Sequence, residues 1–380
     1  MQKDIGFLLN HYSVHQVPHI VPYAFELSRL HEDARVQILC STEAEAAFAE
    51  RIGRTYEGHR CSIELLDLPL WARVVEPVAS KIFFARKNII LAHHAARLAR
   101  LDVLVVPEMT SVALKRRADF SNVKMVFTMH GAGDRAGCPF DERLRMFDLV
   151  LMPGRKYAEA LVDGGVADAE KSVLAGYPKF EAMDRIGVQR RKFFDNDRPV
   201  VVYNPHHYAK QSSWPKFGRQ VLDYFYQSAD YNLIFAPHTL LFKRSWGKGQ
   251  RFPGKYKPAD NVLIDLGSMA SSDLTYMRSA DIYLGDVSSQ VYEFLEQPRP
   301  CVFLDAHDAQ WEGNPFYRSW TFGPVIDDPA MLHEALLKAR EEHARYLPKQ
   351  VEGFDYTFEK SGTSAAVRGA RAIARLAGLE

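Results

Sequence analysis

Residues 261–305 of this chain, NVLIDLGSMASSDLTYMRSADIYLGDVSSQVYEFLEQPRPCVFLD, decide its fold. Their pattern predicts a strand, a helix, a strand, a polar loop, a helix and a strand in succession. Ile282–Leu284 is a short apolar run typical of a buried strand, and Gly285–Ser289 is the polar loop that follows it. Pro298 ends the next helix before Cys301–Leu304, the last strand of the stretch. This order of elements indicates an α/β fold with a parallel sheet.

The polar loop is a candidate anion site, because it lies at the N-terminus of a predicted helix. Such a terminus offers backbone N–H groups and the positive end of the helix dipole, and the hydroxyls of Ser288 and Ser289 add donors for a phosphate or pyrophosphate. Glu293 lies one turn beyond Ser289 on the same helix face, where a carboxylate would meet sugar hydroxyls. The alternative is that Asp286 and the serines only cap the helix, which such residues do more often than they bind a ligand.

Length and composition suggest two domains of similar size. A chain of 380 residues, 47% of them hydrophobic, is longer than a domain with one hydrophobic core ordinarily is. A net charge of +1 argues against a general nucleic-acid binder. The cysteines are widely separated and form no CxxC pair, so neither a disulfide scaffold nor a structural zinc site is indicated, and a reducing cytoplasm is the simplest compartment. They are Cys40, Cys61, Cys138 and Cys301.

No apolar stretch of the sequence reaches the length of a membrane span, and the N-terminus shows no signal-peptide pattern. We therefore predict a cytoplasmic chain that is soluble or at most peripheral on the inner face of the plasma membrane. The segment Trp71–Arg100 mixes basic residues with Ile82, Phe83 and Phe84, a composition that suits contact with an anionic membrane surface. A solvated pair of amphipathic helices is the alternative.

Strands alternate with helices along both halves of the chain, which predicts two Rossmann-like parallel sheets. The basic stretch Arg185–Arg198 lacks strand character and is the predicted linker. We therefore predict an N-terminal domain over residues 1–185 and a C-terminal domain over residues 199–360, with helices at Ala330–Tyr346 and Ala365–Leu376 near the end. The predicted strands are Ile5–Leu9, Val36–Cys40, Ile63–Leu68, Val103–Pro107, Val123–Met129, Leu149–Met152, Val173–Leu174, Pro199–Tyr203, Leu233–Phe235, Ile282–Leu284 and Cys301–Leu304.

Neither GxGxxG after the first strand nor GxxxxGK[ST], GxSxG or HExxH occurs, which disfavours nicotinamide, P-loop, hydrolase and zincin chemistry.

Histidines follow several of the predicted strands. His130, with Gly131 after it, follows Val123–Met129, while His206 and His207 follow the first strand of the second half and His238 follows the next. Open α/β sheets present their ligands at the carboxyl ends of strands, so these side chains are candidates for a binding cleft. The alternative for His130 is a turn with an incidental histidine.

Several motifs in one order resemble the CDP-glycerol glycerophosphotransferases of the teichoic-acid type. Leu284–Ser289, followed by Tyr292–Phe294 and Arg299–Leu304, resembles the family signature "TDYSS…FDF…RPMIFF". The resemblance covers roughly residues 120–325. It departs from the family pattern at Met129 in place of the family tryptophan, at Ala132–Arg135, and at the missing arginine before His238. The other matching pieces are Met129–Gly131 for "WHG", Phe147–Gly154 for "FDYVLVSS", Gly176–Lys179 for "GxPR" and Ala236–His238 for "RPH".

This resemblance implies a GT-B fold, an α/β architecture in which two Rossmann-like domains have parallel sheets that face a central cleft. The C-terminal domain would bind the nucleotide-diphosphate donor and the N-terminal domain the acceptor. The last helix, within residues 363–380, would pack back on the N-terminal domain. The departures from the family pattern lie at donor and acceptor positions, so the exact donor and acceptor do not follow from it.

The resemblance also implies a reaction. A hydroxyl of a cell-surface glycan or lipid-linked saccharide attacks the distal phosphorus of CDP-glycerol or CDP-ribitol, and CMP leaves. His130 is the predicted general base, and His238 binds the pyrophosphate or assists the leaving CMP. No metal or further cofactor is predicted. The other predicted donor-binding residues are Ser288 and Ser289 for the diphosphate, Glu293 for the ribose, Asp286 to cap the loop or orient His238, and Gly131, Arg135, His206, His207 and Lys210.

Two other functions use the same fold or the same ligands. One is a GT-B glycosyltransferase or a UDP-sugar 2-epimerase-like enzyme acting on a nucleotide sugar. The other is a non-catalytic nucleotide-binding or scaffold protein of a surface-polysaccharide complex. A sugar enzyme would prefer UDP or GDP compounds to CDP compounds, and a scaffold would show no turnover.

Overall fold

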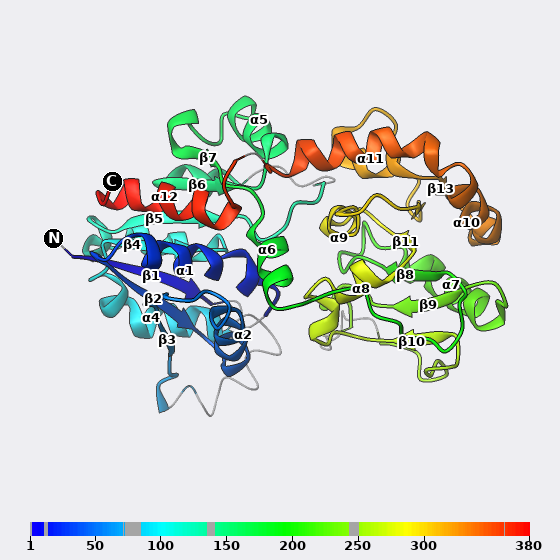
Figure 1. The fold of residues 1–380 in the computed structure, drawn as a ribbon, viewed down its shortest axis with the longest axis horizontal. Coiled ribbons are helices and arrows are strands. Elements are labelled where there is room, and N and C mark those ends of the chain that lie inside the picture. Colours follow the sequence, from blue (N-terminus) through cyan, green and yellow to red (C-terminus); the bar gives the residue numbers. More distant parts are fainter. Residues whose placement is uncertain are drawn as a thin grey trace. The chain divides into compact units, whose positions relative to one another are not determined.

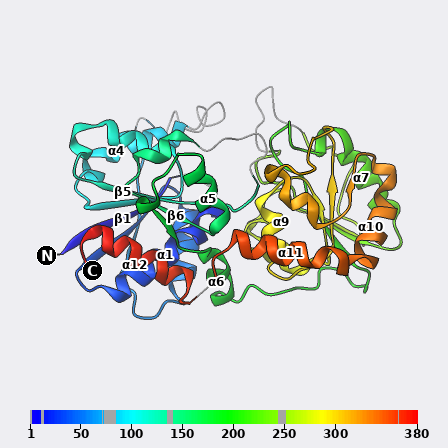
Figure 2. The ribbon, with the colours of Figure 1, turned by 90° about the horizontal axis from the view of Figure 1, so that it is seen from above.

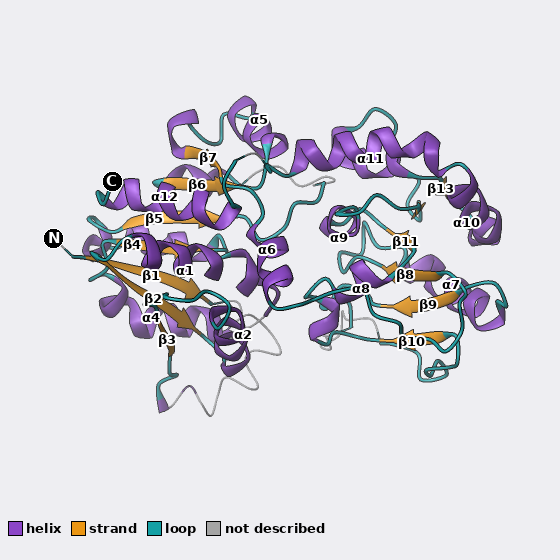
Figure 3. Cartoon of the chain, viewed as in Figure 1, coloured by secondary structure: helices purple, strands orange, loops and turns teal. Residues whose placement is uncertain are grey.

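The computed structural model describes residues 2–10, 14–70, 72, 85–134, 141–242, 251–360 and 362–380. The chain divides into two compact units (Figure 1). Unit 1 comprises Met1–Gly131, Phe140–Gly187 and Asp355–Glu380, and unit 2 comprises Ala132–Pro139 and Val188–Phe354. In both units strands alternate with helices, as the sequence predicts (Figure 3).

Unit 1 contains a 7-stranded parallel sheet in the order β3-β2-β1-β4-β5-β6-β7. The first strand pairs with β2 on one side and β4 on the other, so the direction in which strands are added reverses at β1. Doubly wound sheets bind ligands beside the carboxyl ends of the strands at such a reversal. The strands are β1 (Lys3–Leu9), β2 (Ala34–Cys40), β3 (Ser62–Leu65), β4 (Val103–Val106), β5 (Lys124–Thr128), β6 (Leu149–Met152) and β7 (Ser172–Leu174).

Helices cover both faces of the unit 1 sheet, with α1 and α12 on one face and α4 on the other (Figure 2). Burial on both faces explains why inner strands such as β4 and β6 are continuous apolar runs rather than alternating ones. Thr42 caps α2, and its hydroxyl accepts from the backbone N–H of Glu45 while the Glu45 carboxylate accepts from Thr42 N–H. The helices of this unit are η1 (Val14–His19), α1 (Val21–Leu30), α2 (Glu43–Gly53), α4 (Ala85–Leu98), η2 (Thr110–Arg116), η3 (Ala118–Phe120), η4 (Glu142–Met146), α5 (Arg155–Asp163), η5 (Ala169–Lys171), α6 (Pro178–Arg185) and α12 (Ala365–Ala377).

Unit 2 contains a 6-stranded parallel sheet in the order β10-β9-β8-β11-β12-β13, and its reversal lies at β8, between β9 and β11. The strands are β8 (Val200–Asn204), β9 (Asn232–Phe235), β10 (Val262–Ile264), β11 (Ile282–Gly285), β12 (Cys301–Leu304) and β13 (Val325–Ile326). The helices are α7 (Trp214–Gln227), η6 (Met269–Ser271), α8 (Thr275–Ser279), α9 (Ser289–Phe294), η7 (Pro315–Phe322), η8 (Pro329–Met331), α10 (Leu332–Glu341) and α11 (His343–Thr357), the last turn of which belongs to unit 1.

Alternate strand residues of unit 2 form one face of its core. Val201 and Tyr203 of β8 and Ile282 and Leu284 of β11 belong to the same buried cluster. A spacing of two places these side chains on one side of the sheet. Helices α7 and α10 cover that side and contribute Val221, Leu222, Phe225, Leu332 and Leu336.

The end of the chain differs from the prediction of one helix over Ala330–Tyr346. The structure has two helices, α10 and α11, separated at Glu342. The second helix continues through Pro348 to Thr357, whereas a proline ordinarily favours a helix end just before it. Sequence rules therefore placed the end too early.

The division into units also differs from the predicted domain limits. The main segment of unit 2 begins at Val188 rather than at residue 199. The chain returns to unit 1 at Asp355, whereas the prediction placed this return at residue 363. The segment Ala132–Pro139, predicted within the N-terminal domain, belongs to unit 2. Helix α12 belongs to unit 1 and packs against α1.

Among the described residues, no helix combines the length and the apolar character that crossing a bilayer requires. Residues 73–84, which carry the predicted membrane-facing composition, lie outside the described ranges.

Candidate functional site

Polar residues from three strand ends meet where the strand order of unit 2 reverses. His206 and His207 follow β8, His238 follows β9, and the loop Asp286–Ser288 follows β11. Because β9, β8 and β11 are adjacent parallel strands, their carboxyl ends lie at one edge of the sheet. The structure thus places together most of the donor-binding residues predicted in the second half of the chain.

The three histidines form one cluster. The ring centroids of His207 and His238 are 4.1 Å apart, those of His206 and His207 are 4.5 Å apart, and those of His206 and His238 are 5.6 Å apart. His238 is further held by its backbone N–H, which donates to the carbonyl of Pro205 at 3.0 Å. A hydrogen bond between the two strand exits therefore fixes the cluster to the sheet edge.

Backbone hydrogen bonds determine where two of these rings carry their proton. The Nδ1 of His206 accepts from Tyr208 N–H at 3.1 Å, and the Nδ1 of His238 accepts from Leu240 N–H at 3.2 Å. A neutral imidazole that accepts at Nδ1 is protonated at Nε2, so both rings present Nε2–H donors. Such donors suit the oxygens of a phosphate.

The pKa of His206 is lowered to about 3. The main cause is burial, and the neighbouring His207 adds a smaller effect in the same direction. With this lowered pKa, His206 is neutral at physiological pH. His207 and Lys210 are exposed. The cluster combines one constitutively neutral donor with exposed bases.

Asp286 has a different role from the two that the sequence suggested. It is fully buried, and its Oδ2 accepts from His206 N–H at 2.8 Å and from Ser213 N–H at 2.9 Å. Its carboxylate therefore holds the loop between β8 and α7 and neither caps α9 nor orients His238. Burial raises the pKa of Asp286 to about 7, and the hydrogen bonds from Ser213 and His206 oppose that rise.

The N-terminus of α9 is capped by Ser288. The Ser288 hydroxyl accepts from Gln290 N–H at 3.2 Å and donates to Asn204 Oδ1 at 3.5 Å. The amide of Asn204 in turn donates to the Ala236 carbonyl at 2.6 Å, which links the ends of β8, β9 and β11. Ser289 is half-buried, and Glu293 is buried at 4% exposure.

The segment that follows Gly131 packs on this same helix. Asp134 accepts from the Tyr292 hydroxyl at 2.8 Å and from Ser319 N–H at 2.7 Å. Gly133 lies directly against the backbone of Ser289. Arg135, a predicted donor-binding residue, lies outside the described residues.

We expect Gly133→Ala to lower the thermal midpoint of unit 2. A Cβ at this position would lie 2.5 Å from Ser289 N and 2.9 Å from Ser289 Cα, and these are backbone atoms that cannot rotate away. The strain should cost about 1–3 kcal/mol. Gly254→Ala is the matched control, because its Cβ would meet nothing within 4 Å. Equal midpoints for the two variants, measured by calorimetry, would contradict the close packing of Gly133 on α9.

In unit 1, His130 follows β5 and has a defined proton position. Its Nδ1 lies 2.5 Å from the carbonyl oxygen of Pro107, which follows β4. A carbonyl only accepts, so Nδ1 carries the proton and Nε2 carries the lone pair of the neutral ring. His130 is thus arranged to accept a proton at Nε2, the opposite of His206 and His238. Gly131 follows it at the end of the unit 1 segment.

Sequence reasoning missed several polar residues near these sites. Ser213 and Asn204 act through their contacts with Asp286 and Ser288, and no local motif marks them. His15, His19 and Lys179 gather near His130 in unit 1. The four-residue spacing of His11, His15 and His19 was the one available signal for the last group.

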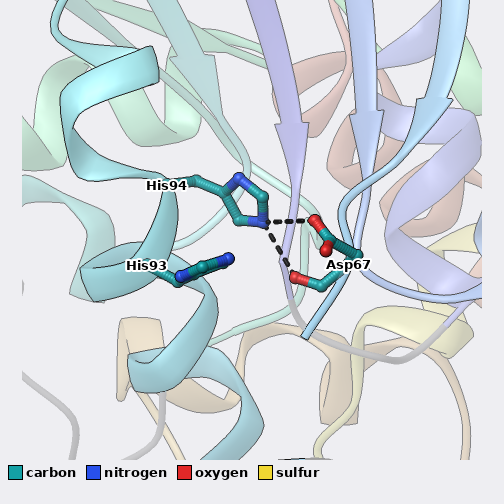
Figure 4. Close-up of side chains that lie close together, drawn as sticks. All are labelled: Asp67, His93 and His94. Atoms are coloured by element: carbon teal, nitrogen blue, oxygen red, sulfur yellow. Dashed lines mark hydrogen bonds and ion pairs between the residues drawn. The ribbon is translucent and has the colours of Figure 1, made fainter. Parts of the chain in front are cut away.

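The described residues include one group of three side chains able to hold a metal ion, Asp67, His93 and His94 (Figure 4). The His94 Nε2 lies 2.9 Å from the backbone carbonyl of Asp67 and 3.5 Å from its Oδ1. Because the carbonyl only accepts, Nε2 carries a proton and is not a metal ligand in this arrangement. We assign this group a structural role in joining α4 to the segment after β3. The expectation of a metal-free reaction stays a prediction.

Comparison with known proteins finds likeness in fold but not in sequence. No family model and no curated protein sequence matches the chain. The wall teichoic acid polymerase TagF matches with a TM-score of 0.60 at 16% identity, over 99% of this chain and 88% of that chain. Another structure of that polymerase is a histidine-to-asparagine variant soaked with CDPG.

Two further solved structures match equally well. MnaA of S. aureus, solved with UDP, has a TM-score of 0.60 at 14% identity over 100% of this chain and 98% of that chain. A putative UDP-N-acetylglucosamine 2-epimerase from Listeria monocytogenes has a TM-score of 0.61 at 14% identity over 99% of this chain and 96% of that chain. With its two parallel sheets, the chain therefore has the GT-B-like fold of these enzymes.

Proposed function

We propose that this protein transfers glycerol phosphate, or a related polyol phosphate, from a CDP-activated donor to a hydroxyl of a cell-surface glycan or lipid-linked acceptor and releases CMP. The observation that carries the proposal is the cluster of His206, His207 and His238 at the strand reversal of unit 2. The family resemblance of the motifs and the fold of the teichoic acid polymerase support the same choice.

The histidine cluster suits a diphosphate. In phosphoryl transfer the protein contributes mainly positioning and charge stabilisation. The Nε2–H groups of His206 and His238 would donate to the diphosphate oxygens, and the exposed His207 and Lys210 would add positive charge when protonated. Asp286 would act indirectly, by holding the loop that carries His206.

His130 suits the acceptor side of the reaction. Its Nε2 lone pair would take the proton of the acceptor hydroxyl as the new oxygen–phosphorus bond forms at the distal phosphorus. The bond between that phosphorus and the bridging oxygen then breaks, and its electron pair leaves with CMP. The hydrogen bond to the Pro107 carbonyl fixes the ring and stabilises the imidazolium that results.

A nucleotide-sugar enzyme is the second candidate, because the UDP-bound MnaA and the putative epimerase match the fold as well as the polymerase does. The residues around His130 do not decide between the two candidates, because a histidine can act as general base in either reaction. The preference for CDP or UDP compounds separates them.

A ligand-stabilisation screen tests the proposal. A ligand that binds the native state raises the free energy of unfolding, by about 2.7 kcal/mol at one hundred times its Kd. We expect the thermal midpoint to rise with CMP, CDP-glycerol and CDP-ribitol. A rise of the thermal midpoint confined to UDP, UDP-N-acetylglucosamine or GDP-mannose would contradict the proposal and indicate a nucleotide-sugar enzyme. No rise with any nucleotide would favour a scaffold.

A lipid-linked acceptor would bring the protein to the inner face of the plasma membrane. A flotation assay with anionic vesicles tests that contact separately from the screen, since the nucleotide result does not depend on the membrane.

A further inference from the structure

A buried ion pair lies next to the carbonyl that His130 contacts in unit 1, and the roles proposed above do not use it. Lys87 of α4 and Glu108, which follows β4, are 7% and 3% exposed. The Lys87 Nζ lies 2.5 Å from Glu108 Oε2. Strand β4 pairs with β1, at which the strand order reverses, so the pair lies where open sheets hold functional groups. A buried ion pair adds little net stability compared with apolar residues of the same volume, so stability alone does not explain it.

Hydrogen bonds hold both members of this pair from several sides. The Glu108 carboxylate accepts from the backbone N–H groups of Thr110 at 2.7 Å and Ser111 at 3.1 Å, and from the hydroxyls of both residues. The backbone carbonyl of Lys87 accepts from the Asn10 amide at 3.0 Å, at the exit of β1. Helix η2, which begins at Thr110, packs against α4. The pair therefore joins the exits of β1 and β4 to α4.

Glu108 is charged and fully engaged. Burial raises the pKa of its carboxyl group, but the ammonium of Lys87 and the hydroxyls of Ser111 and Thr110 together lower it more, so the pKa lies below its ordinary value. The carboxylate is therefore ionised at physiological pH and only accepts hydrogen bonds. A carboxylate stabilised by this many donors is a weak base, so any part it has in catalysis must act through another residue.

The peptide group between Pro107 and Glu108 provides that connection. The Pro107 carbonyl is the group that His130 Nδ1 contacts at 2.5 Å, and it determines that Nε2 carries the lone pair. A peptide group is planar, and the proline ring fixes the φ angle on its other side. The direction of the carbonyl therefore depends on where Glu108 is anchored, and Lys87, Thr110 and Ser111 provide the anchor.

We propose that Lys87 and Glu108 are positioning residues that fix the tautomer and the ring orientation of His130 through the Pro107 carbonyl. Without the Lys87 charge, the buried carboxylate is uncompensated, so its segment moves toward water or the carboxylate takes up a proton. The Pro107 carbonyl then turns, and a smaller fraction of the protein presents the lone pair at Nε2 of His130. The consequence for catalysis rests on the proposed transfer reaction, whereas the effect on the ring does not.

The first test observes the His130 ring in the full-length protein by NMR with ¹⁵N-labelled histidine, at a pH where the ring is neutral. The protonated nitrogen and the lone-pair nitrogen of a neutral imidazole have different ¹⁵N shifts, and His130→Gln assigns the signals. We expect the Nδ1–H form in wild type and a mixture of tautomers in Lys87→Met and Glu108→Gln. The same His130 spectrum in wild type and in both folded variants would overturn the proposal.

Two further variants keep this test decisive. Ser111→Ala removes one hydroxyl donor from Glu108 and should shift the tautomer in the same direction by a smaller amount, even if the charge variants do not fold. Glu26→Gln is the matched control, because Glu26 is a glutamate of unit 1 at 4% exposure whose carboxylate pairs with Arg29 at 2.9 Å. It should lower the thermal midpoint without changing the His130 ring. An equal change of the ring in Glu26→Gln would indicate general loosening of unit 1 and contradict the proposal.

The second test measures the kinetics of transfer from CDP-glycerol. Lys87→Met should lower kcat by about 10–100-fold, because a misplaced catalytic group costs rate in that range. The KM for the donor should stay nearly unchanged, since the donor histidines belong to unit 2. Lys87→Arg keeps the positive charge and should restore most of the rate. A raised KM with an unchanged kcat in Lys87→Met would contradict a role in positioning His130.

The two tests together separate this proposal from the proposed function. If the tautomer shifts in the variants and wild type transfers nothing from any CDP compound, the positioning role stands and the transfer reaction fails. If wild type transfers and the His130 ring does not respond to Lys87→Met or Glu108→Gln, the positioning role fails alone. A shifted tautomer combined with a wild-type kcat would refute the link between the pair and catalysis.

Discussion

His130→Ala should reduce kcat by about 10²–10⁴-fold in a transfer assay with CDP-glycerol, because removal of a general base costs rate in that range. The Nδ1 of His130 donates to the Pro107 carbonyl, which leaves the Nε2 lone pair to take the hydroxyl proton. The donor histidines belong to unit 2. Donor affinity, measured from CMP or CDP-glycerol titrations, should therefore stay nearly unchanged.

Two matched variants sharpen this result. His93→Ala removes another histidine of unit 1 from an exposed position and should leave kcat near the wild-type value. His130→Gln keeps a polar side chain of similar reach but supplies no base, so it should be as slow as His130→Ala. Turnover that survives in both His130 variants would remove His130 from the role of base. A parallel loss of donor affinity would instead indicate a role in binding.

Asp286→Ala should lower the free energy of unfolding by about 2–4 kcal/mol. The carboxylate accepts from the backbone N–H groups of His206 and Ser213 within a fully buried site, and each buried donor left without a partner costs about 1–3 kcal/mol. Urea unfolding at fixed pH measures the loss. Asp230→Asn, at an exposed position in the same unit, is the control and should change stability little.

The pH dependence of Asp286→Asn gives an independent check on the same residue. Burial raises the folded-state pKa of Asp286 to about 7, above about 3.9 for an unperturbed carboxyl. Between these values the folded protein binds more protons than the unfolded protein, so the contribution of Asp286 is fully present below about pH 4 and falls as the pH rises to about 7. Asparagine does not titrate.

The stability of wild type relative to Asp286→Asn should therefore decrease across that window and stay constant above it. A difference that is flat between pH 4.5 and 8 would show that the Asp286 carboxyl keeps an ordinary pKa. The comparison cancels the titration of all other groups that the two proteins share.

Much of the fold was predictable because strand and helix patterns are local. The apolar runs at Ile5–Leu9 and Ile282–Leu284 predicted β1 and β11. The failures had physical causes as well. Helix α11 continues through Pro348, and Ala132–Pro139 belongs to unit 2 because Asp134 bonds to Tyr292 and Ser319, far away in the sequence.

The sequence predicted which residues belong to the candidate site but not their contacts or their roles. The rule that ligands lie at strand exits selected His130, His206, His207 and His238, and the structure places each of them after a strand. The rule did not predict the roles of Asp286, which depends on Ser213 at a distance of 73 positions along the chain. It also missed His19 and Lys179, which only the packing of α6 on η1 brings together.

By itself, the sequence determined the order of strands and helices and the residues at each strand exit, because hydrophobic period, caps and turns depend on neighbours in the chain. Only the tertiary structure decided that β8 lies between β9 and β11, which gathers the unit 2 histidines at one edge. It also decided the proton positions, at Nδ1 of His130 through Pro107 and at Nε2 of His206 and His238 through backbone N–H groups. Strand order and hydrogen-bond partners depend on contacts between residues distant in sequence, and no local pattern encodes them.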